Sequence, residues 1–417
     1  MRNHPLIKTL LELRGNPRIC VYTEPLWVVP FYLFTPFVSV YMAALLLTDQ
    51  QIGIVASVFA LSQAVAALLS GALTDKMGRR FATLVFDCLS WSVPALLWML
   101  SQNFWWFVVA ASFNGLLQIP TVSWVCLLIE DAEKSKLVNI FSLLYVIGQM
   151  AVVFAPIAGI MVNSMSVVPV MRILYGFTFV SMTTKFILLY KLCDETKVGK
   201  VRKKETEGMS VFKVMSGYGG ILKQIFASRE MVLSLAMITM FGAAGMIMGN
   251  FFGLYTTGNL MLPQHMLAYF PIVRSVIILI FMFGLQKWFN RLGFSRPMLM
   301  GIVIYVLSHV VLVLSPVGSV GMVFVYILLE ACAVSLVMPR RESMTAILIE
   351  PSERARITGL LASLSFAITI PFGALAGWLS NIDRRLPFLA NIVIFAMAFA
   401  VILRNKGLIT EKMDNKE

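Results

Sequence analysis

Long runs of apolar residues, separated by short polar segments, set the pattern of this chain. A helix that crosses a membrane needs about 20 mostly apolar residues, and twelve runs are long enough. They predict spans at residues 20–47, 52–73, 81–100, 104–129, 137–162, 169–191, 231–257, 265–286, 297–315, 319–341, 357–379 and 386–403. The expected fold class is an all-α integral membrane protein with twelve transmembrane helices.

Composition supports this interpretation. The chain is 59% hydrophobic and 13% charged, which excludes an ordinary soluble domain. Arg14 and Arg18 lead directly into the first span without a small-residue cleavage site, so no cleavable signal peptide is expected. The five cysteines are scattered, which disfavours a disulfide framework or a metal site. No Walker loop, catalytic triad or metal motif is present, so we expect neither an enzyme nor an ATP-driven pump, and no cofactor.

The basic residues indicate the orientation of the spans. With both termini in the cytoplasm, 29 of the 34 Lys and Arg lie in inner segments, and the outer loops carry only Arg384 and Arg385. We therefore expect a multi-pass protein of the plasma (inner) membrane with cytoplasmic termini. The net charge of +13 then faces the cytoplasm and anionic lipid, and no nucleic-acid partner is needed to explain it.

The chain contains an internal repeat. Residues 128–137 read Leu-Ile-Glu-Asp-Ala-Glu-Lys-Ser-Lys-Leu, and residues 348–357 read Leu-Ile-Glu-Pro-Ser-Glu-Arg-Ala-Arg-Ile. A repeated sequence of this kind predicts two related six-span halves, 1–192 and 231–417, joined by a cytoplasmic linker at 193–230. Within the linker, the polar segment 194–208 is expected to be mobile and 209–228 to form an amphipathic helix on the inner leaflet.

The most specific motif is residues 71–80, Gly-Ala-Leu-Thr-Asp-Lys-Met-Gly-Arg-Arg. Gly78 suits a tight turn that needs a positive φ, and the basic residues hold the turn on the cytoplasmic side. A carboxylate so close to the bilayer, Asp75, needs a partner. The segment resembles the signature loop of the Major Facilitator Superfamily, Gly-x-Leu-x-Asp-(Arg/Lys)-x-Gly-Arg-(Arg/Lys), at every defined position.

This resemblance implies an architecture. Spans one, four, seven and ten line a central cavity, spans two, five, eight and eleven pack the halves together, and the others face lipid. Asp75 then faces the start of the eleventh span, and Arg79 pairs with Glu130. In the second half Asn290 replaces the acid, so a latch there is weaker. The residues expected to form this conformational latch are Gly71, Asp75, Lys76, Gly78, Arg79, Arg80, Glu130, Glu350 and Arg354.

Charged and polar residues inside the spans are the candidates for binding. Glu330 lies near the middle of the tenth span and Arg274 at a comparable depth in the eighth, so we expect the two to pair. The pair has a static structural role or a role in substrate or proton binding; both alternatives stay open. The full set of substrate-binding or ion-binding candidates is Glu330, Arg274, Tyr326, Asn114, Gln118, Thr121, Trp124, Tyr32, Thr35, Asn250 and Glu24. Interhelical hydrogen bonding is the alternative role for the polar members.

Lys185, Asp87 and Glu24 also receive separate interpretations. Lys185 is expected to extend to the inner surface, where its ammonium reaches water. Asp87 is expected to support the signature loop. Glu24 lies near the inner surface and is a candidate gate residue.

The resulting functional hypothesis is a secondary active transporter that moves a small molecule by alternating access. Ala151-x-x-x-Ala155-Pro156-x-x-Gly159 is a degenerate form of the family's fifth-span antiporter motif and favours efflux of amphipathic compounds, whereas Ala111 replaces the Arg of a fourth-span motif. A proton is the expected coupling ion, and a monomer is the expected state. The alternatives are a nutrient or organic-anion symporter and a non-transporting membrane sensor or scaffold.

Overall fold

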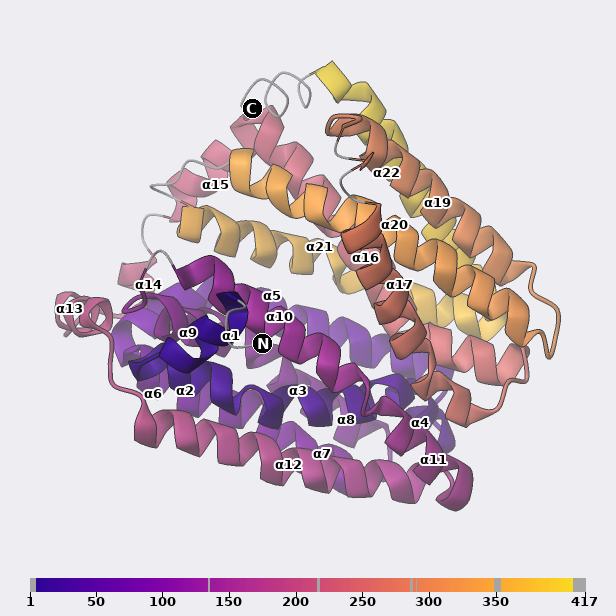
Figure 1. Ribbon diagram of the computed structural model, residues 1–417, viewed down its shortest axis with the longest axis horizontal. Helices are drawn as coiled ribbons and strands as arrows, with labels where there is room; N and C mark the ends of the chain where they lie inside the picture. The colour runs from indigo at the N-terminus through magenta and orange to yellow at the C-terminus, as the bar shows by residue number, and fades with distance from the viewer. Residues whose placement is uncertain are drawn as a thin grey trace. The chain divides into compact units, whose positions relative to one another are not determined.

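The computed structural model describes residues 5–133, 136–215, 218–285, 288–289, 291–348 and 354–407. The regular structure in these ranges is helical (Figure 1). Twelve helical stretches are long and apolar enough to cross a membrane, which confirms the predicted number of spans. They are Gly15–Ala44, Asp49–Met77, Arg79–Leu100, Phe104–Ile129, Asn139–Met165, Val167–Leu192, Arg229–Asn259, Gln264–Met282, Ser295–Val313, Val320–Glu342, Gly359–Ile382 and Leu386–Arg404.

Several spans consist of more than one helical segment. A short helix, α1 (Pro5–Glu12), precedes the first span. In chain order the segments of the first six spans are α2 (Gly15–Thr23), α3 (Pro25–Phe34), α4 (Val38–Ala44), α5 (Asp49–Met77), α6 (Arg79–Asp87), α7 (Val93–Leu100), α8 (Phe104–Asn114), α9 (Gln118–Ile129), α10 (Leu137–Val152), α11 (Ala155–Met165) and α12 (Val167–Leu192). The last six are formed by α16 (Arg229–Leu254), α17 (Phe270–Gly284), α19 (Ser295–Val313), α20 (Val320–Leu348), α21 (Arg354–Ile382) and α22 (Leu386–Arg404).

Proline and local hydrogen-bond changes explain the interruptions. Pro25 begins α3, and Pro36 lies in the 3-10 turn Thr35–Phe37 between α3 and α4, because proline lacks the amide that would continue a helix. In the third span a π-helical turn, Cys88–Ser92, separates α6 from α7. Pro156 follows the break between α10 and α11, where it is tolerated in the first helical turn.

The linker contains more helix than expected. Residues 197–205, within the segment predicted to be mobile, form the helix α13 (Lys197–Glu205), which begins at a cap: the Thr196 hydroxyl accepts a hydrogen bond from the Gly199 amide at 2.9 Å. The predicted amphipathic segment contains two helices, α14 (Val211–Val214) and α15 (Tyr218–Ala227). Ile221 and Ile225 of α15 are buried, whereas Phe226 is exposed.

The chain forms two compact units. The first contains residues 1–35 and 58–219, and the second contains residues 36–57 and 220–417. Residues 36–57 precede the linker in sequence but belong to the second unit, where small residues allow a close helix contact. A Cβ added at Gly373 would lie 2.7 Å from the Gly53 carbonyl oxygen, and one at Gly377 would lie 2.8 Å from the Asp49 carbonyl oxygen. Only glycine permits this approach of α5 to α21.

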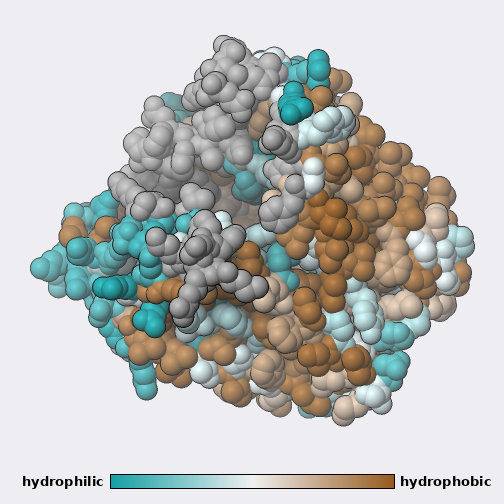
Figure 2. Space-filling model, in the orientation of Figure 1, coloured by the Kyte–Doolittle hydropathy of each residue, from teal (hydrophilic) through white to brown (hydrophobic). Residues whose placement is uncertain are grey.

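Each unit has its own apolar core. In the first unit, Cys20, Leu127, Ile140 and Leu189 are among the buried side chains that pack together. In the second, the rings of Tyr305 and Phe395 stack with centroids 4.6 Å apart. Figure 2 shows apolar surface over α19 and α22, where residues such as Val303, Leu307, Val393 and Met397 are exposed, as expected of side chains that face lipid.

Candidate functional site

The signature motif folds as a helix end and a one-residue turn, a shorter turn than the sequence indicated. α5 continues through Asp75 to Met77, Gly78 alone has a positive φ of 85°, and α6 begins at Arg79. Glu195, from the linker, caps the start of α6: its carboxylate accepts hydrogen bonds from the amides of Arg79 at 2.9 Å and Arg80 at 3.1 Å. The carboxylate satisfies amides that have no partner within the helix and opposes the positive end of its dipole.

Arg79 is the centre of this network, and its side chain is only 6% exposed. Its Nη1 lies 2.9 Å from Asp75 Oδ1, and its Nε lies 3.2 Å from both carboxylate oxygens of Glu130. The Thr196 hydroxyl donates a further hydrogen bond to Glu130. The pair expected from the sequence, Arg79 with Glu130, is therefore present, and it connects spans two, three and four to the linker.

The other basic residues of the motif bind backbone carbonyls. Lys76 Nζ lies 2.8 Å from the Met209 carbonyl oxygen. Arg80 Nε lies 2.6 Å from the Tyr190 carbonyl oxygen, and its guanidinium lies 4.4 Å from the centre of the Tyr190 ring. Gly71 packs near the Tyr218 hydroxyl, with room for a Cβ at 3.5 Å.

Two of the predicted latch residues have no described side chain, and three linker residues that were not predicted contribute to the site. Glu350 lies outside the described residues, and Arg354 begins α21 but its side chain is not among those described. Sequence reasoning missed Glu195, Thr196 and Met209. Asp-Glu-Thr directly after a span is a usable signal, because such residues are frequent caps, but here the polar composition suggested mobility instead.

Arg274 and Glu330 form the expected ion pair in the second unit. Arg274 Nε lies 2.7 Å from Glu330 Oε2, and Nη2 lies 3.1 Å from Oε1, so the contact is bidentate. The Arg274 side chain is 42% exposed and that of Glu330 is 15% exposed. A guanidinium at this depth in a span is unfavourable in hydrocarbon, and the contact with Glu330 offsets part of that cost.

Buried aromatic and polar residues surround this pair. Tyr326 lies one helical turn before Glu330 on α20 and is buried, and its ring lies 5.8 Å from the His309 ring and 5.6 Å from the Phe252 ring. His309 is 1% exposed, and its Nε2 lies 3.3 Å from Asn391 Nδ2. Sequence reasoning missed His309, because a lone histidine in an apolar span has no spacing signal.

A second buried ion pair occurs in the first unit. Lys185 Nζ lies 2.7 Å from Glu24 Oε2, and the ammonium lies 5.1 Å from the centre of the Trp124 ring and 5.8 Å from that of Trp27. The expectation that Lys185 extends to the inner surface is therefore wrong: the residue is 5% exposed. An acidic partner and two aromatic faces offset part of the cost of burying the ammonium, and a single span does not reveal them.

Asp87 also differs from its expected role. It is 8% exposed, and its carboxylate lies near Lys185 and Glu24. No hydrogen bond joins it to that loop in the described part of the chain.

The remaining polar candidates mostly satisfy backbone groups. Asn114 is buried, and its Nδ2 donates to the Ser90 carbonyl oxygen at 2.7 Å, which is an interhelical hydrogen bond. Thr35, Thr121 and Asn250 donate to carbonyls of their own helices, those of Phe31, Leu117 and Met246. Gln118 and Tyr32 are half-buried. The interhelical alternative therefore describes Asn114, whereas Thr35, Thr121 and Asn250 form hydrogen bonds within their own spans.

Asp49 and Arg384 form a pair that sequence reasoning missed. Arg384 donates from Nε to Asp49 Oδ2 at 2.7 Å and from Nη2 to Oδ1 at 2.9 Å, and Ser380 donates to Oδ2 at 2.7 Å. Asp49 begins α5, and Arg384 follows α21. The sequence contained one signal for this pair: the predicted outer loops carry only two basic residues, and Arg384 is one of them.

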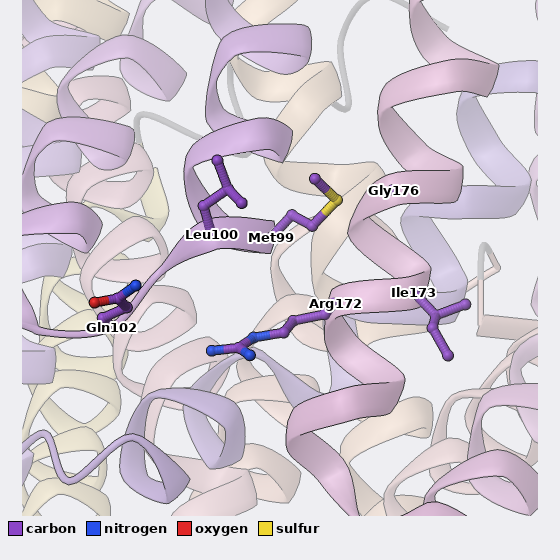
Figure 3. A pocket seen from close by; sticks show the side chains of 6 residues that line it. All are labelled: Met99, Leu100, Gln102, Arg172, Ile173 and Gly176. Carbon is purple, nitrogen blue, oxygen red and sulfur yellow. The ribbon is translucent and has the colours of Figure 1, made fainter.

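A cavity of about 480 Å³ lies near the turn between α7 and α8 (Figure 3). Arg172 extends from α12 toward Gln102, and Nη2 lies 3.4 Å from the Ser101 carbonyl oxygen. Leu100 and Met99 line the other side. None of the predicted binding residues contributes to this cavity. Within the described ranges, no three His, Cys, Asp or Glu side chains are grouped so that they could hold a metal ion.

Twelve apolar helices with charged pairs inside the spans define a multi-pass membrane protein. A family model described as Major Facilitator Superfamily matches residues 28–339. The chain belongs to the Major Facilitator Superfamily, a family of transporters, and is a transporter of small molecules, not an enzyme.

Solved structures share the fold at low sequence identity. A mutant of the nucleoside transporter NupG is 14% identical, with a TM-score of 0.72, and the match covers 93% of this chain and 99% of that one. A mutant of the peptide transporter POT is 13% identical, with a TM-score of 0.72 and 95% of each chain covered. The human organic anion transporter MFSD10 (TETRAN) is 13% identical, with a TM-score of 0.63 and coverage of 96% and 100%. No curated protein matches the sequence.

Proposed function

We propose that the protein is a proton-coupled secondary transporter that exports small amphipathic molecules by alternating access. The observation that carries the proposal is the Arg274–Glu330 pair. A charged residue at mid-span costs about 2.5–3.5 kcal/mol or more, so such residues are usually paired or functional. The bidentate contact pairs these two, and the Arg274 side chain as a whole is 42% exposed.

Protonation of Glu330 would change this pair in a defined way. A neutral carboxyl no longer attracts the guanidinium as an ion, so Arg274 becomes available to a polar group of a substrate. Loss of the proton restores the pair and displaces that group. Proton binding and substrate binding thus compete for the same two side chains, and this competition would couple their movements.

Export is supported by the fifth span, where the degenerate antiporter motif coincides with the break between α10 and α11. The proposal also places the protein in the plasma (inner) membrane as a monomer with cytoplasmic termini. The latch residues, including the expected contact of Asp75 with the start of the eleventh span, would stabilise one conformation.

Symport of an organic anion is the second candidate, and the cationic, partly exposed Arg274 side chain favours it. When Glu330 is protonated, a substrate carboxylate or phosphate could take its place as the partner of Arg274 through the same two donors. This candidate predicts entry of an anion together with a proton.

The test uses purified protein in proteoliposomes with an imposed pH gradient. Ethidium is the probe for an amphipathic cation and fluorescein the probe for an organic anion. We expect gradient-dependent movement of ethidium, opposite in direction to the proton, and loss of the gradient dependence in Glu330→Gln. Glu342→Gln, an exposed position on the same helix, is the matched control and should keep it. Fluorescein movement with the proton would favour the symporter, and movement of neither probe in the unmodified protein would contradict both candidates.

A further inference from the structure

Three charged residues of the first unit are buried near one another, and the charges of their ionised forms do not sum to zero. Lys185 is 5% exposed, Asp87 is 8% exposed and Glu24 is 9% exposed. They come from three spans: Lys185 from α12, Asp87 from the end of α6, and Glu24 from the junction of α2 and α3. α12 packs against both α3 and α6, so the Lys185 ammonium lies near two carboxylates.

The Lys185 ammonium contacts one of these two carboxylates. Lys185 binds Glu24 at 2.7 Å, while no ion pair or hydrogen bond reaches the Asp87 carboxylate from any described residue. The Trp124 ring, on α9, covers the ammonium at 5.1 Å. Asp87 is thus a carboxyl group that is more than nine-tenths buried, with its nearest cation already paired.

If all three groups were ionised, the cluster would hold one positive and two negative charges. An uncompensated carboxylate in a low-dielectric interior is unfavourable by several kcal/mol, and a buried acid escapes this by taking up a proton. The other titratable groups nearby do not supply a cation. Cys88 follows Asp87 on its own helix, and Cys20, on α2, lies near Lys185 and Glu24.

The backbone that follows Asp87 is irregular. The π-helical turn Cys88–Ser92 begins directly after Asp87. π-Helical turns interrupt the regular hydrogen-bond ladder and are frequent at functional sites. The backbone that carries the unpaired acid is therefore the irregular part of its span.

We propose that Asp87 is a proton-binding site of the first unit, and that its proton controls the partner of Lys185. With Asp87 protonated, Lys185 binds Glu24, as observed. When Asp87 loses the proton, two carboxylates compete for one flexible ammonium, and Lys185 becomes shared between them. This site is separate from Glu330 and stands even if Glu330 has only a structural role.

The experiment detects the proton directly and needs no substrate. Purified protein in detergent is treated with dicyclohexylcarbodiimide, an apolar reagent that modifies protonated carboxyl groups, over a series from about pH 5 to about pH 9, and adducts are located by mass spectrometry. Infrared spectra over the same series record the C=O stretch of protonated carboxyl groups. We expect an adduct on Asp87 that decreases as the pH rises, and a protonated-carboxyl band that is lost in Asp87→Asn.

The controls separate this site from other acids. Asp383→Asn, at an exposed position, should leave both signals unchanged. Lys185→Met should add Glu24 to the modified residues, because that carboxylate then loses its ammonium. A protonated-carboxyl band that is unchanged in Asp87→Asn would overturn the proposal. So would a band that is absent at every pH, whether or not the reagent reaches the residue. Neither readout depends on transport, so failure of the proposed function would leave this result intact.

Discussion

Arg384 binds both oxygens of the Asp49 carboxylate, at 2.7 and 2.9 Å, and so connects the start of α5 to the end of α21. The two residues belong to different sequence repeats but to the same compact unit. The Asp49 side chain is 7% exposed and that of Arg384 is 30% exposed. Any movement that separates these ends of the second and eleventh spans has to break this contact.

We therefore expect Asp49→Asn to destabilise the second unit. Hydrogen bonds to charged groups contribute about 1.5–3 kcal/mol each, and the partial exposure of Arg384 places the expected loss at about 1–3 kcal/mol. Thermal unfolding in detergent measures the effect. Asp383→Asn, one residue from Arg384 and exposed, is the control. Equal melting temperatures for the two variants would show that the Asp49 pair does not stabilise the unit.

The contact between α5 and α21 depends on glycine. Gly373→Ala should destabilise the protein by about 1–3 kcal/mol, because the added Cβ would lie 2.7 Å from the Gly53 carbonyl oxygen and the two helices would have to separate. Gly359→Ala lies on the same helix with open space around it, and it should be neutral or slightly stabilising because alanine favours helix. The measurement is again thermal unfolding, and the same response from both variants would be inconsistent with tight packing.

The linker should stabilise the signature motif through Glu195. Glu195→Gln weakens the cap on two amides of α6, and we expect a loss of about 0.5–2 kcal/mol and faster hydrogen exchange of the Arg79 and Arg80 amides. Glu205→Gln, exposed on α13, is the matched control. Unchanged exchange at both amides in Glu195→Gln would show that the cap contributes nothing in solution.

Arg79→Ala leaves two carboxylates, Asp75 and Glu130, without their shared cation. We expect this variant and Asp75→Asn to insert into the membrane normally but to lose transport of the probe that the unmodified protein moves. Arg202→Ala, an exposed arginine of α13, serves as the control. Full turnover by Arg79→Ala in proteoliposomes would show that the Arg79 network is not needed for the transport cycle.

The Arg274–Glu330 pair should show energetic coupling. Removing one partner of a buried pair costs about 3–5 kcal/mol, and the 42% exposure of Arg274 suggests a value below that range. The double variant Arg274→Met with Glu330→Gln should recover part of the loss. A double-mutant cycle of unfolding free energies measures the coupling, and additive single effects would refute it.

The sequence predicted the spans well because each depends on local composition, and it predicted pairs whose members occupy similar depths. Glu330 with Arg274 is such a case, and Arg79 with Glu130 followed from a family motif. Prediction from the sequence failed where the partner of a residue lies far away along the chain. Lys185 lies about two turns from the inner end of its span, where a lysine alone would reach water, and only the fold brings Glu24 and the tryptophan rings to it. Asp49 and Arg384 are 335 residues apart, and no short-range pattern connects them.

The grouping of residues 36–57 with the second unit also has a consequence for biosynthesis. The ribosome completes this segment early, but its glycine contacts on α21 and the guanidinium that binds Asp49 are translated near the end of the chain. Until those residues are synthesised, the segment lies in the membrane with Asp49 unpaired and the glycine face of α5 uncovered. The first repeat therefore cannot reach its final packing as each span is inserted. Its last step of maturation has to follow synthesis of the eleventh span, and a nascent chain stalled before that point would present the uncovered face to the cell's membrane chaperones and proteases.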